Sequence, residues 1–395
     1  MYDNFLDEAI SKYKTPFYIF DIDVLVKQIK KIKSVLGKNV ELCYAMKANP
    51  FVIKGMENVI DSFEVCSPGE FHICERAKIN MEKIIMSGVY KNEDDIEHAI
   101  VNYGHKITYT VESLMQWQNL KECACKHNVS INVLLRLTMG NQFGMDEKVI
   151  EEIISNRNSY KNIEIEGIQF FSGTQKKSGG RIKKELNMLD DFCENLKTSY
   201  GFDAKRLEYG PGLPISYFEE EKDCEDEVLN ILAEELSKLK FKGRIVLEVG
   251  RFIAATCGSY ITSVVDIKSN QGQNYCIVDG GIHHINYYGQ MLAMKKPPII
   301  HLNKEESGEV EEWTVCGSLC TMNDVLIKQY PFINLQLKDK LVFKKVGAYS
   351  VCEGISLFLS RELPQVILYS KENGFSLARN NFPTDKLNYI QDKNY

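Results

Sequence analysis

The sequence predicts an α/β fold in which a (β/α)8 barrel of the TIM type is followed by a second, β-rich domain. Two observations lead to this fold class. Short apolar segments of strand length recur up to residue 249 at intervals of roughly 20 to 40 residues, separated by helical patterns or by connections that contain Asn and Gly. Beyond Arg251 long helical patterns become scarce and strand-like runs follow one another closely. A chain of 395 residues is long enough for both domains.

Hydrophobic spacing predicts the first helix and the first barrel strand. Residues 21–36 place apolar side chains four, three and four positions apart, at Leu25, Ile29, Ile32 and Leu36. This spacing predicts an amphipathic helix, with Asp21 or Asp23 as its N-cap. In residues 40–46, which follow shortly after, apolar side chains occupy every second position. We expect a strand there, with Lys47 at its C-terminal end.

Eight strand candidates precede Arg251, and eight strands close a barrel of this kind. They span residues 40–46, 62–65, 83–86, 106–111, 131–137, 166–171, 205–209 and 244–249. Functional side chains in such barrels gather at the C-terminal ends of the strands. The strand ends here carry Lys47, Ser67, Glu70, Arg136, residues 172–175, residues 210–212, Glu248 and Arg251.

We expect the barrel to span residues 22–255 and the β-rich domain to span residues 256–395 together with residues 1–21. The strand-like runs of the second domain are residues 258–267, 274–278, 311–315, 340–345 and 365–369. Residues 16–20 are a further strand candidate, which is expected to pair with this domain.

Composition argues against several classes of protein. A hydrophobic share of 44%, a charged share of 26% and a formal net charge of −6 are ordinary for a globular protein and give no sign of nucleic-acid binding. No window reaches the roughly 18 apolar residues of a membrane span, and the N-terminus lacks a signal-peptide core. The twelve cysteines are scattered, so we expect reduced thiols and a cytoplasmic protein. Cys123 and Cys125 have no second ligand pair, and we expect no metal site.

Lys47 is the candidate nucleophile. On the expected strand it shares a face with the small residues Cys43 and Ala45, so we expect its amine to be partly desolvated and its pKa to be lowered. The alternative is a solvated lysine at a strand end.

Two loops at strand ends are candidate anion sites. Residues 210–212 (Gly-Pro-Gly) can let backbone N–H groups approach an anion, and residues 172–174 (Ser-Gly-Thr) can add hydroxyl and amide donors. Ordinary turns are the alternative for both. Glu248 ends the last strand close to Gly250 and Arg251. A carboxylate there could face a pyridine nitrogen and keep the ring protonated, or could form a surface ion pair.

In order and spacing, these segments resemble the fold type III decarboxylases that depend on pyridoxal 5'-phosphate (PLP), the group of ornithine and diaminopimelate decarboxylases. The resemblance covers nearly the whole chain. Residues 44–49 (YAMKAN) resemble the PLP-lysine motif of the family, and residues 63–67 (FEVCS) with Glu70 resemble its next strand end. Arg136 matches the family's LR strand, and residues 143–144 match its FG pair.

The later motifs carry the same resemblance. Residues 210–212 occupy the place of the phosphate-binding triple glycine, and residues 248–251 resemble the motif whose glutamate binds the pyridine nitrogen. Residues 316–326 (CGSLCTMNDVL) resemble the catalytic-cysteine motif, which places the thiol on Cys320. Residues 347–349 (GAY) resemble a segment that contacts the cofactor phosphate.

The resemblance implies PLP-dependent decarboxylation of an amino acid at Cα. PLP would form a Schiff base with Lys47, Glu248 would bind the pyridine nitrogen, and Cys320 would return a proton to Cα after CO2 leaves. The implied cofactor-binding residues are Lys47, Glu64, Arg136, Phe171, Thr174, Gly210, Gly212, Glu248, Gly250, Arg251 and Tyr349. A homodimer is also implied, in which Cys320 and Asp324 reach into the barrel of the partner subunit.

Two departures from the family pattern concern the substrate. Phe171 stands where many members carry a histidine stacked on the cofactor ring, and Thr321 stands where ornithine and diaminopimelate enzymes place an acid for the distal amine. A free basic side chain is therefore a poorer fit. The residues expected to bind substrate are His283, Thr321 and Asp324.

A narrower subgroup shares several segments with this chain. Thr321, residues 279–284 (DGGIHH), residues 289–290 (GQ) and the FSGTQ run resemble it, and it includes the carrier-protein-bound glutamate decarboxylase of antibiotic assembly and decarboxylases associated with exosortase clusters. The substrate would then be a specialised amino acid, free or tethered to an acyl carrier protein. Residues 176–184 (KKSGGRIKK) are a candidate docking loop for an acidic carrier, and a solvated basic loop is the alternative.

Three other functions stay open at this point. The first is a diaminopimelate, ornithine or lysine decarboxylase. The second is an amino-acid racemase of the same barrel type, although the ring nitrogen of such enzymes typically faces an arginine, and Glu248 argues for decarboxylation. The third is a non-catalytic regulatory paralogue, against which the presence of Lys47, Glu248, Cys320 and Tyr349 argues.

Overall fold

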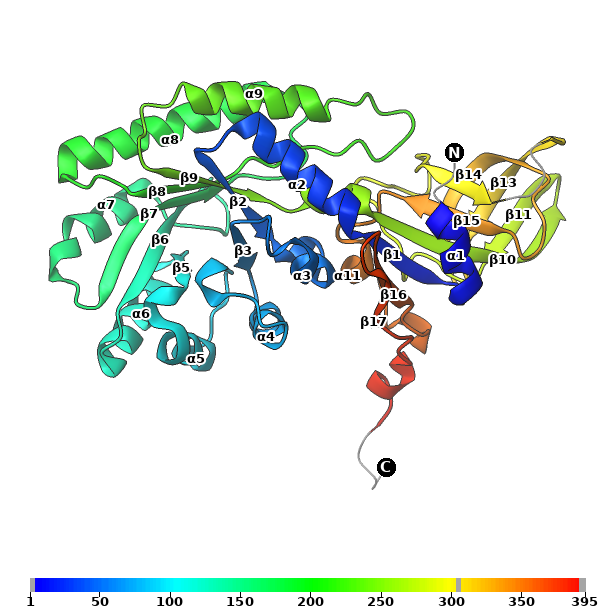
Figure 1. Ribbon diagram of the computed structural model, residues 1–395, viewed down its shortest axis with the longest axis horizontal. Coiled ribbons are helices and arrows are strands. Elements are labelled where there is room, and N and C mark those ends of the chain that lie inside the picture. The colour runs from blue at the N-terminus through cyan, green and yellow to red at the C-terminus, as the bar shows by residue number, and fades with distance from the viewer. Residues whose placement is uncertain (1–3, 303–306, 391–395) are drawn as a thin grey trace. The chain divides into compact units, whose positions relative to one another are not determined.

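The computed structural model of the chain describes residues 4–302 and 307–390 and confirms the predicted fold class (Figure 1). The chain divides into two compact units. The barrel unit comprises Val26–Ile215 and Cys224–Ile253. The β unit comprises Met1–Leu25, Ser216–Asp223 and Ala254–Tyr395.

Eight parallel strands form a closed barrel in the barrel unit. Each strand pairs with the next along the chain, and the last pairs with the first to close the ring. The strands lie close to their predicted positions: β2 (Val40–Ala45), β3 (Ser62–Val65), β4 (Ile84–Met86), β5 (Thr108–Val111), β6 (Ile131–Leu137), β7 (Ile163–Phe171), β8 (Arg206–Gly210) and β9 (Arg244–Val249).

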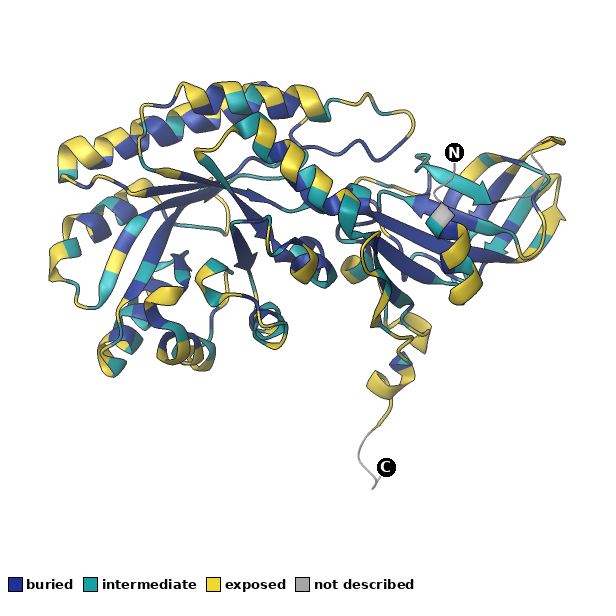
Figure 2. Cartoon of the chain, viewed as in Figure 1, coloured by how far each residue is buried: buried dark blue, intermediate teal, exposed yellow. Residues whose placement is uncertain are grey.

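Helices cover the outside of the barrel, so most strand residues are buried on both faces, whereas the helices expose one face to solvent (Figure 2). Leu25, Ile29 and Ile32 of the first amphipathic helix are fully buried, as the spacing predicts. The helices are α2 (Ile22–Leu36), α3 (Ile53–Met56), α4 (Pro68–Arg76), α5 (Glu93–Tyr103), α6 (Leu114–His127), α7 (Glu147–Ser155), α8 (Gly179–Tyr200), α9 (Glu225–Ser237) and α10 (Arg251–Ala254).

Side-chain caps fix where several of these helices begin. Ser67, Asn92 and Ser113 are the N-caps of α4, α5 and α6, and each accepts a hydrogen bond from the amide three residues further on, at 2.8 to 3.2 Å. Asp21 caps α2 in the same way, through the amide of Val24 at 3.0 Å. The caps of α4, α5 and α6 hold the chain in place just after β3, β4 and β5, where candidate site residues lie.

The β unit is built around a nine-stranded mixed sheet with the order β14-β13-β11-β10-β1-β16-β17, in which β15 pairs with β10 and β12. As predicted, the N-terminal strand β1 belongs here, antiparallel to β10 and parallel to β16. The strands are β1 (Phe17–Asp21), β10 (Gly258–Asn270), β11 (Gln273–Val278), β12 (Ile299–Leu302), β13 (Val310–Cys316), β14 (Val325–Ile333), β15 (Lys340–Lys344), β16 (Gln365–Ser370) and β17 (Gly374–Arg379).

Two short helices complete the β unit, α1 (Asn4–Lys12) and α11 (Ser350–Glu353). Leu6 and Ala9 of α1 pack on the sheet against Phe17, Ile261 and Ile367. Strands β12, β14 and β17 were not predicted. Of these, β14 carries Pro331, which removes a ladder donor and obscures the strand pattern.

The Asn92 cap gives a testable expectation for the fold. Replacing Asn92 by Ala leaves the amide of Asp95 without its acceptor, and we expect the free energy of unfolding to fall by about 1 kcal/mol. Urea denaturation followed by circular dichroism measures this change. Asn92→Ser retains an acceptor and is expected to stay near the wild type, and equal losses in both variants would contradict a capping role.

Candidate active site

Lys47 lies at the C-terminal end of the barrel, in the turn that follows β2. The strand ends at Ala45, and Lys47 is in a short 3-10 helix, Met46–Ala48, rather than on the strand itself. Its Nζ is 2.7 Å from Oε2 of Glu64 and 3.5 Å from Sγ of Cys66. The neighbouring strand β3 therefore supplies the ion-pair partner of the candidate nucleophile.

The expectation that the pKa of Lys47 is lowered is wrong. Burial does lower this pKa, but the adjacent carboxylate of Glu64 outweighs it and raises the pKa well above the ordinary value. The small neighbours on β2 predict only the desolvation, whereas this carboxylate comes from β3. In the chain alone the amine is thus protonated, and it must lose that proton before it can act as a nucleophile.

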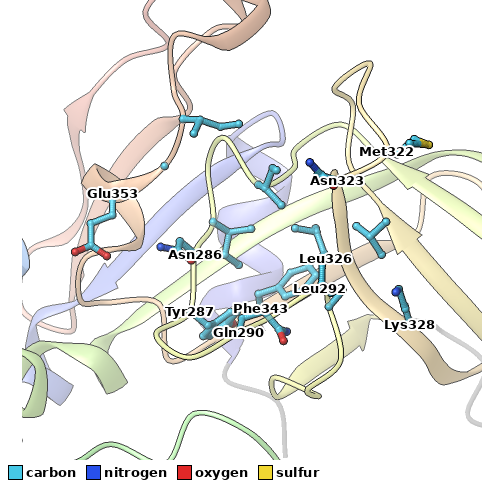
Figure 3. Close-up of a pocket in the computed structure, with 16 residues that line it drawn as sticks. Asn286, Tyr287, Gln290, Leu292, Met322, Asn323, Leu326, Lys328, Phe343 and Glu353 are labelled. Carbon is cyan, nitrogen blue, oxygen red and sulfur yellow. The ribbon is translucent and has the colours of Figure 1, made fainter. Parts of the chain in front are cut away.

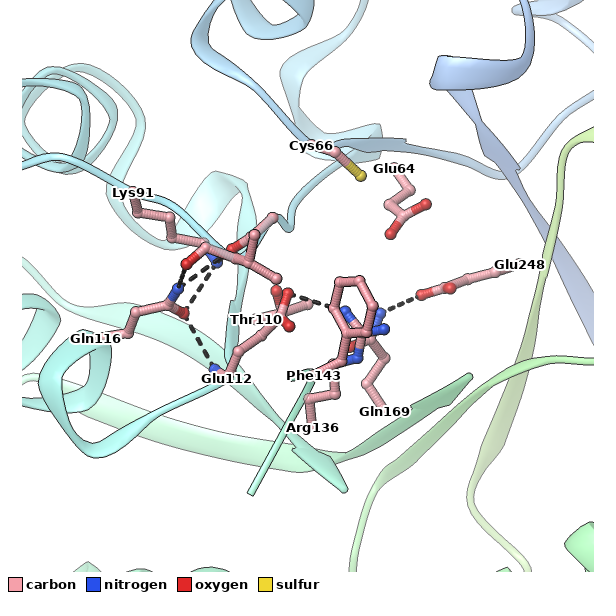
Figure 4. A network of polar contacts seen from close by, with 12 residues as sticks. Glu64, Cys66, Lys91, Thr110, Glu112, Gln116, Arg136, Phe143, Gln169 and Glu248 are labelled. Atoms are coloured by element: carbon pink, nitrogen blue, oxygen red, sulfur yellow. Dashed lines mark hydrogen bonds and ion pairs between the residues drawn. The ribbon is translucent and has the colours of Figure 1, made fainter. Parts of the chain in front are cut away.

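Glu64 and Arg136 belong to the same cluster of buried charges (Figure 4). Burial alone would raise the pKa of Glu64, but the ammonium of Lys47 and the guanidinium of Arg136 outweigh it and lower that pKa. Arg136 Nη1 forms an ion pair with Glu112 Oε1 at 2.9 Å, and its guanidinium lies 4.8 Å from the centre of the Phe143 ring.

Gly144, which follows Phe143, occupies a position that favours glycine. Its φ is +76°, and a Cβ there would lie 2.8 Å from the carbonyl oxygen of Arg136. The close approach lets the amide of Met145 donate to that carbonyl at 2.8 Å. The Phe-Gly pair thus fixes the strand end that carries Arg136.

Glu248 is the residue before the end of β9 and its side chain is buried, so the alternative of a surface ion pair is excluded. Its Oε1 accepts a hydrogen bond from Gln169 Nε2 at 2.5 Å (Figure 4). Burial, together with the charges of Glu64 and Glu208, raises the pKa of Glu248 well above the ordinary value. A cationic partner placed against this carboxylate would stabilise its ionised form.

The glycines after β7 and β8 bring two strand ends into direct backbone contact. A Cβ on Gly210 would lie 2.4 Å from the ring of Phe171, so that ring packs on the bare backbone of β8. Gly212 has φ +63°, and its Cβ would lie 2.0 Å from the carbonyl oxygen of Gly173 and 3.2 Å from Cα of Thr174. Pro211 has no N–H, so an anion held here must use other donors of the two loops.

The five basic residues in segment 176–184 have different surroundings. Lys176 is buried and forms an ion pair with Glu185 at 2.6 Å. Arg181 is exposed and pairs with the same carboxylate at 2.9 Å, and Tyr209 donates to it at 2.7 Å. From Gly179 onward the segment belongs to helix α8.

Gly250 and Arg251 follow Glu248. A Cβ on Gly250 would lie 3.1 Å from Cβ of Ala48 and 3.2 Å from Cβ of Ala45, so this glycine lets the end of β9 approach the Lys47 turn. Arg251 begins α10 and is buried.

Cys320 is exposed on the turn between β13 and β14 of the β unit. Asp324, on the same turn, is buried, and its two oxygens accept hydrogen bonds from the amides of Ile282 and Leu319 at 2.8 and 2.7 Å. Asp324 therefore holds the turn against the segment after β11, and its carboxylate is committed to the backbone rather than open to a substrate. Thr321 is half-buried and accepts from the amide of Asn323 at 3.3 Å.

The two adjacent histidines of the β unit have different surroundings. His284 is bonded at both ring nitrogens, to Tyr260 and to the carbonyl of Glu362, each at 2.9 Å. Burial and His283 lower the pKa of His284 to about 3, and burial with Arg361 lowers that of His283 to about 4. The buried Nδ1 of His283 has no hydrogen-bond partner among the described residues. Both rings are neutral at physiological pH.

Tyr349 adopts φ +69° at the start of α11, a conformation that a bulky residue rarely takes and that often marks a functional site. The preceding Gly347 packs so closely that a Cβ would lie 1.9 Å from the carbonyl oxygen of Ala254. The GAY segment is thus fixed against the chain just after α10.

A pocket of about 410 Å³ opens beside the Cys320 turn within the β unit (Figure 3). Its wall includes Met322 and Asn323 from that turn. The rest of the wall is mainly apolar, with polar side chains from Asn286, Gln290, Lys328 and Glu353.

Sequence reasoning missed several polar residues that the barrel brings to this end. Gln169 lies two positions before Phe171 on β7, and strand alternation could have placed it inside the barrel. Glu112 directly follows β5. Lys91 is buried, and its Nζ donates to the carbonyl of Gly88 at 2.6 Å and to Gln116 Oε1 at 3.1 Å (Figure 4). Burial lowers the pKa of Lys91 to about 8.

Outside the barrel lumen, one group of potential metal ligands occurs among the described residues. It consists of His72 and Glu75 on α4 and His98 on α5, whose ligand atoms lie within 4.8 Å of one another. No described helix is long and apolar enough to cross a membrane.

A family model described as the pyridoxal binding domain of pyridoxal-dependent decarboxylases matches residues 22–255. L-glutamyl-[BtrI acyl-carrier protein] decarboxylase of Niallia circulans is 27% identical over 95% of this chain and 93% of that protein. Diaminopimelate decarboxylase of Helicobacter pylori is 26% identical over 87% of each chain. Diaminopimelate decarboxylase from M. jannaschii in complex with L-lysine shares the fold, with a TM-score of 0.84, 22% identity and coverage of 98% and 94%.

The glycine contact after β8 can be tested by substitution. Gly212→Ala forces a Cβ into the carbonyl of Gly173 at a positive φ, and we expect a loss of about 1 to 3 kcal/mol in the free energy of unfolding. Gly180→Ala is the matched control, because nothing lies within 4 Å of a Cβ there. Thermal unfolding measures both variants, and a Gly212→Ala protein as stable as the control would contradict the contact.

The raised pKa of Lys47 predicts a slow reaction with aldehydes at neutral pH that becomes faster as pH rises. Glu64→Gln removes the nearest charge that holds the proton, so labelling of Lys47 by a simple aldehyde and borohydride should accelerate about tenfold or more near pH 7. Peptide mass spectrometry measures the labelled fraction. Glu57→Gln, which removes the partner of the exposed Lys54, is the control and should leave Lys47 labelling unchanged.

Proposed function

We propose residue roles and a substrate class for this chain, which belongs to the family of pyridoxal-dependent decarboxylases and is thus an amino acid decarboxylase that uses PLP. The observation that supports this proposal most strongly is a cluster at the C-terminal end of the barrel. In this cluster the amine of Lys47 interacts with the buried carboxyl groups of Glu64 and Glu248.

The residues present fit the cofactor. Side chains at Gly210 and Gly212 would collide with the facing strand end, so the backbone there can approach a phosphate group. Glu248 is a buried carboxylate that lacks, among the described residues, a cationic partner strong enough to offset its burial, and a protonated pyridine nitrogen would provide one. When bound, PLP supplies the electron sink for the carbanion that remains after CO2 departs.

The proposed roles follow from these positions. Lys47 binds the cofactor. Glu64 pairs with the amine of Lys47, and Arg136 helps to keep Glu64 ionised. Phe171, whose ring packs on Gly210, offers a flat face against which the cofactor ring can stack but has no proton to donate. The proposed phosphate-binding residues are Thr174, Gly210, Gly212, Gly250, Arg251 and Tyr349. Glu248 faces the ring nitrogen, which favours decarboxylation over racemisation.

Cys320 is proposed as the acid that returns a proton to Cα. Its thiol is exposed on a turn that Asp324 holds rigid, and Asp324 is therefore proposed as a positioning residue for Cys320. We propose that the turn acts in the barrel of a second copy of the chain, which makes the protein a homodimer. Beside the turn, Met322 is 96% exposed and Leu292 is 73% exposed, and both line the same pocket, as expected of a surface that a partner covers.

The proposed substrate is an amino acid without a free distal ammonium group, such as a glutamyl group on an acyl carrier protein. Thr321 carries no charge, and the oxygens of Asp324 are committed to backbone amides, so neither supplies a carboxylate for a diamino acid. His283 is proposed as a substrate contact, because its buried Nδ1 has no hydrogen-bond partner among the described residues. Similarity to the decarboxylase of an acyl-carrier-bound substrate supports this class.

The state of the cysteines supports the proposal that the protein is cytoplasmic. All twelve lie in the described part of the chain and form no disulfide, which suits a reducing cytoplasm.

The experiment that tests the substrate class is a panel assay for CO2. Free glutamate, lysine, ornithine and diaminopimelate are compared with glutamyl groups tethered to an acyl carrier protein. We expect the highest kcat/KM with a substrate that lacks a distal ammonium group, and preference for a diamino acid would overturn the proposal.

Two variants separate the proposed roles. Lys47→Ala is expected to lose the visible absorbance of the lysine-bound cofactor together with activity. Cys320→Ala is expected to keep that absorbance while losing about 100-fold or more in kcat, as expected when a general acid is removed. Exposed Cys125→Ala is the control for Cys320 and should leave both properties unchanged. Full activity in Cys320→Ala would contradict the proposed acid.

A further inference from the structure

Behind Glu248, the lumen of the barrel holds a second carboxylate and an arginine. Glu208 and Arg206 lie two positions apart on β8, so their side chains point to the same face. Glu208 is fully buried and Arg206 is 4% exposed. Arg206 reaches Thr108 on β5 at 3.3 Å, which shows that this face of β8 is the one inside the barrel.

The two oxygens of Glu208 have different surroundings. One oxygen, Oε2, forms a short ion pair with Arg206 Nη2. The other oxygen, Oε1, is buried and has no hydrogen-bond partner among the described residues. Glu208 also acts on Glu248, whose pKa it raises. A neighbouring carboxyl group can donate to the unpartnered oxygen only if it carries a proton.

Charge decides which carboxyl group holds that proton. Arg206 stabilises the ionised form of Glu208 through direct contact. Within the described part of the chain, Glu248 has no such cation in contact and accepts only the amide of Gln169. Burial and the charges of Glu64 and Glu208 raise the pKa of Glu248, and Lys47 opposes them only in part.

The other groups around the pair fit the same assignment. Cys43, on β2, is fully buried, and burial followed by the charge of Glu208 raises the pKa of its thiol well above the ordinary value. It therefore stays neutral and adds no charge. The immediate set is then the cation Arg206, the anion Glu208 and the neutral acid Glu248, and Glu166 is a second, partly exposed carboxylate 3.5 Å from Arg206.

We propose that Glu208 and Glu248 share one proton in the cofactor-free chain, and that Glu208 is a positioning residue that sets the protonation of the cofactor's ring nitrogen through Glu248. The inference rests on the proposed role of Glu248. Glu248 gives its proton to the ring nitrogen: its O–H bond breaks, an N–H bond forms, and the resulting carboxylate stays paired with the new cation. No net charge enters or leaves the lumen. Arg206 stays paired with Glu208 throughout.

Infrared spectroscopy of the cofactor-free protein at neutral pH tests the shared proton directly. The wild type is expected to show the C=O stretch of a protonated carboxyl group, shifted in D2O. Glu208→Gln should lose that band, because the side-chain amide of this variant can donate to an ionised Glu248. Glu248→Gln should lose it as well, which tests the pair from the other side if Glu208→Gln does not fold.

The matched control is Glu235→Gln on α9, a buried glutamate whose partner is Lys238 and which lies outside the lumen. It is expected to keep the band. No band in the wild type, or a band that survives in both Glu208→Gln and Glu248→Gln, would overturn the proposal.

A second readout uses PLP labelled with 15N at the ring nitrogen. In the wild type the 15N shift should report a protonated nitrogen, and in Glu208→Gln the apparent pKa of that nitrogen should fall by about one unit or more, because a stabilising negative charge is lost. An unchanged nitrogen pKa in a folded Glu208→Gln protein contradicts the positioning role. If the substrate panel fails while the infrared band and the 15N shift behave as expected, the proposed substrate is wrong and the shared proton stands.

Discussion

Charge balance inside a closed barrel is the constraint on which the site depends. A buried carboxylate is costly unless a cation or a proton neutralises it, and this barrel holds several. Glu64 is neutralised by Lys47, Glu112 by Arg136 and Glu208 by Arg206. Glu248 has no cation in direct contact among the described residues, and its raised pKa follows from that arrangement. A protonated ring nitrogen placed against Glu248 would therefore supply the positive charge that the described residues do not bring to this carboxyl group.

Backbone packing supplies the second requirement, which is close approach. Gly210, Gly212 and Gly250 each stand where a Cβ would press on a neighbouring strand end or turn. These contacts bring the ends of β7, β8 and β9 and the Lys47 turn together. A small cofactor can therefore contact several strand ends at once, although those strands are far apart in the sequence.

The fold and the motif residues could be predicted from the sequence because they depend on local patterns. Alternation and spacing located the barrel strands, and the ordered motifs identified residues such as Lys47, Glu248 and Cys320. What could not be predicted depends on which side chains meet across the lumen. The pairing of Lys47 with Glu64 reversed the expected direction of the pKa shift of Lys47. Gln169 on β7 donates to Glu248 on β9, although these two strands do not pair with each other and are separated by β8. The burial of Lys176 could not be predicted either, because its partner Glu185 lies nine residues further on, within helix α8.

We infer that this site removes CO2 from Cα and then returns a proton there. Turnover in D2O tests this inference, with mass spectrometry of the organic product and a count of the CO2 released. We expect one CO2 for each amine formed and a single deuterium at the former Cα. Recovery of the amino acid with deuterium at Cα and without loss of CO2 would contradict it, because the site would then exchange a proton while retaining the carboxyl group.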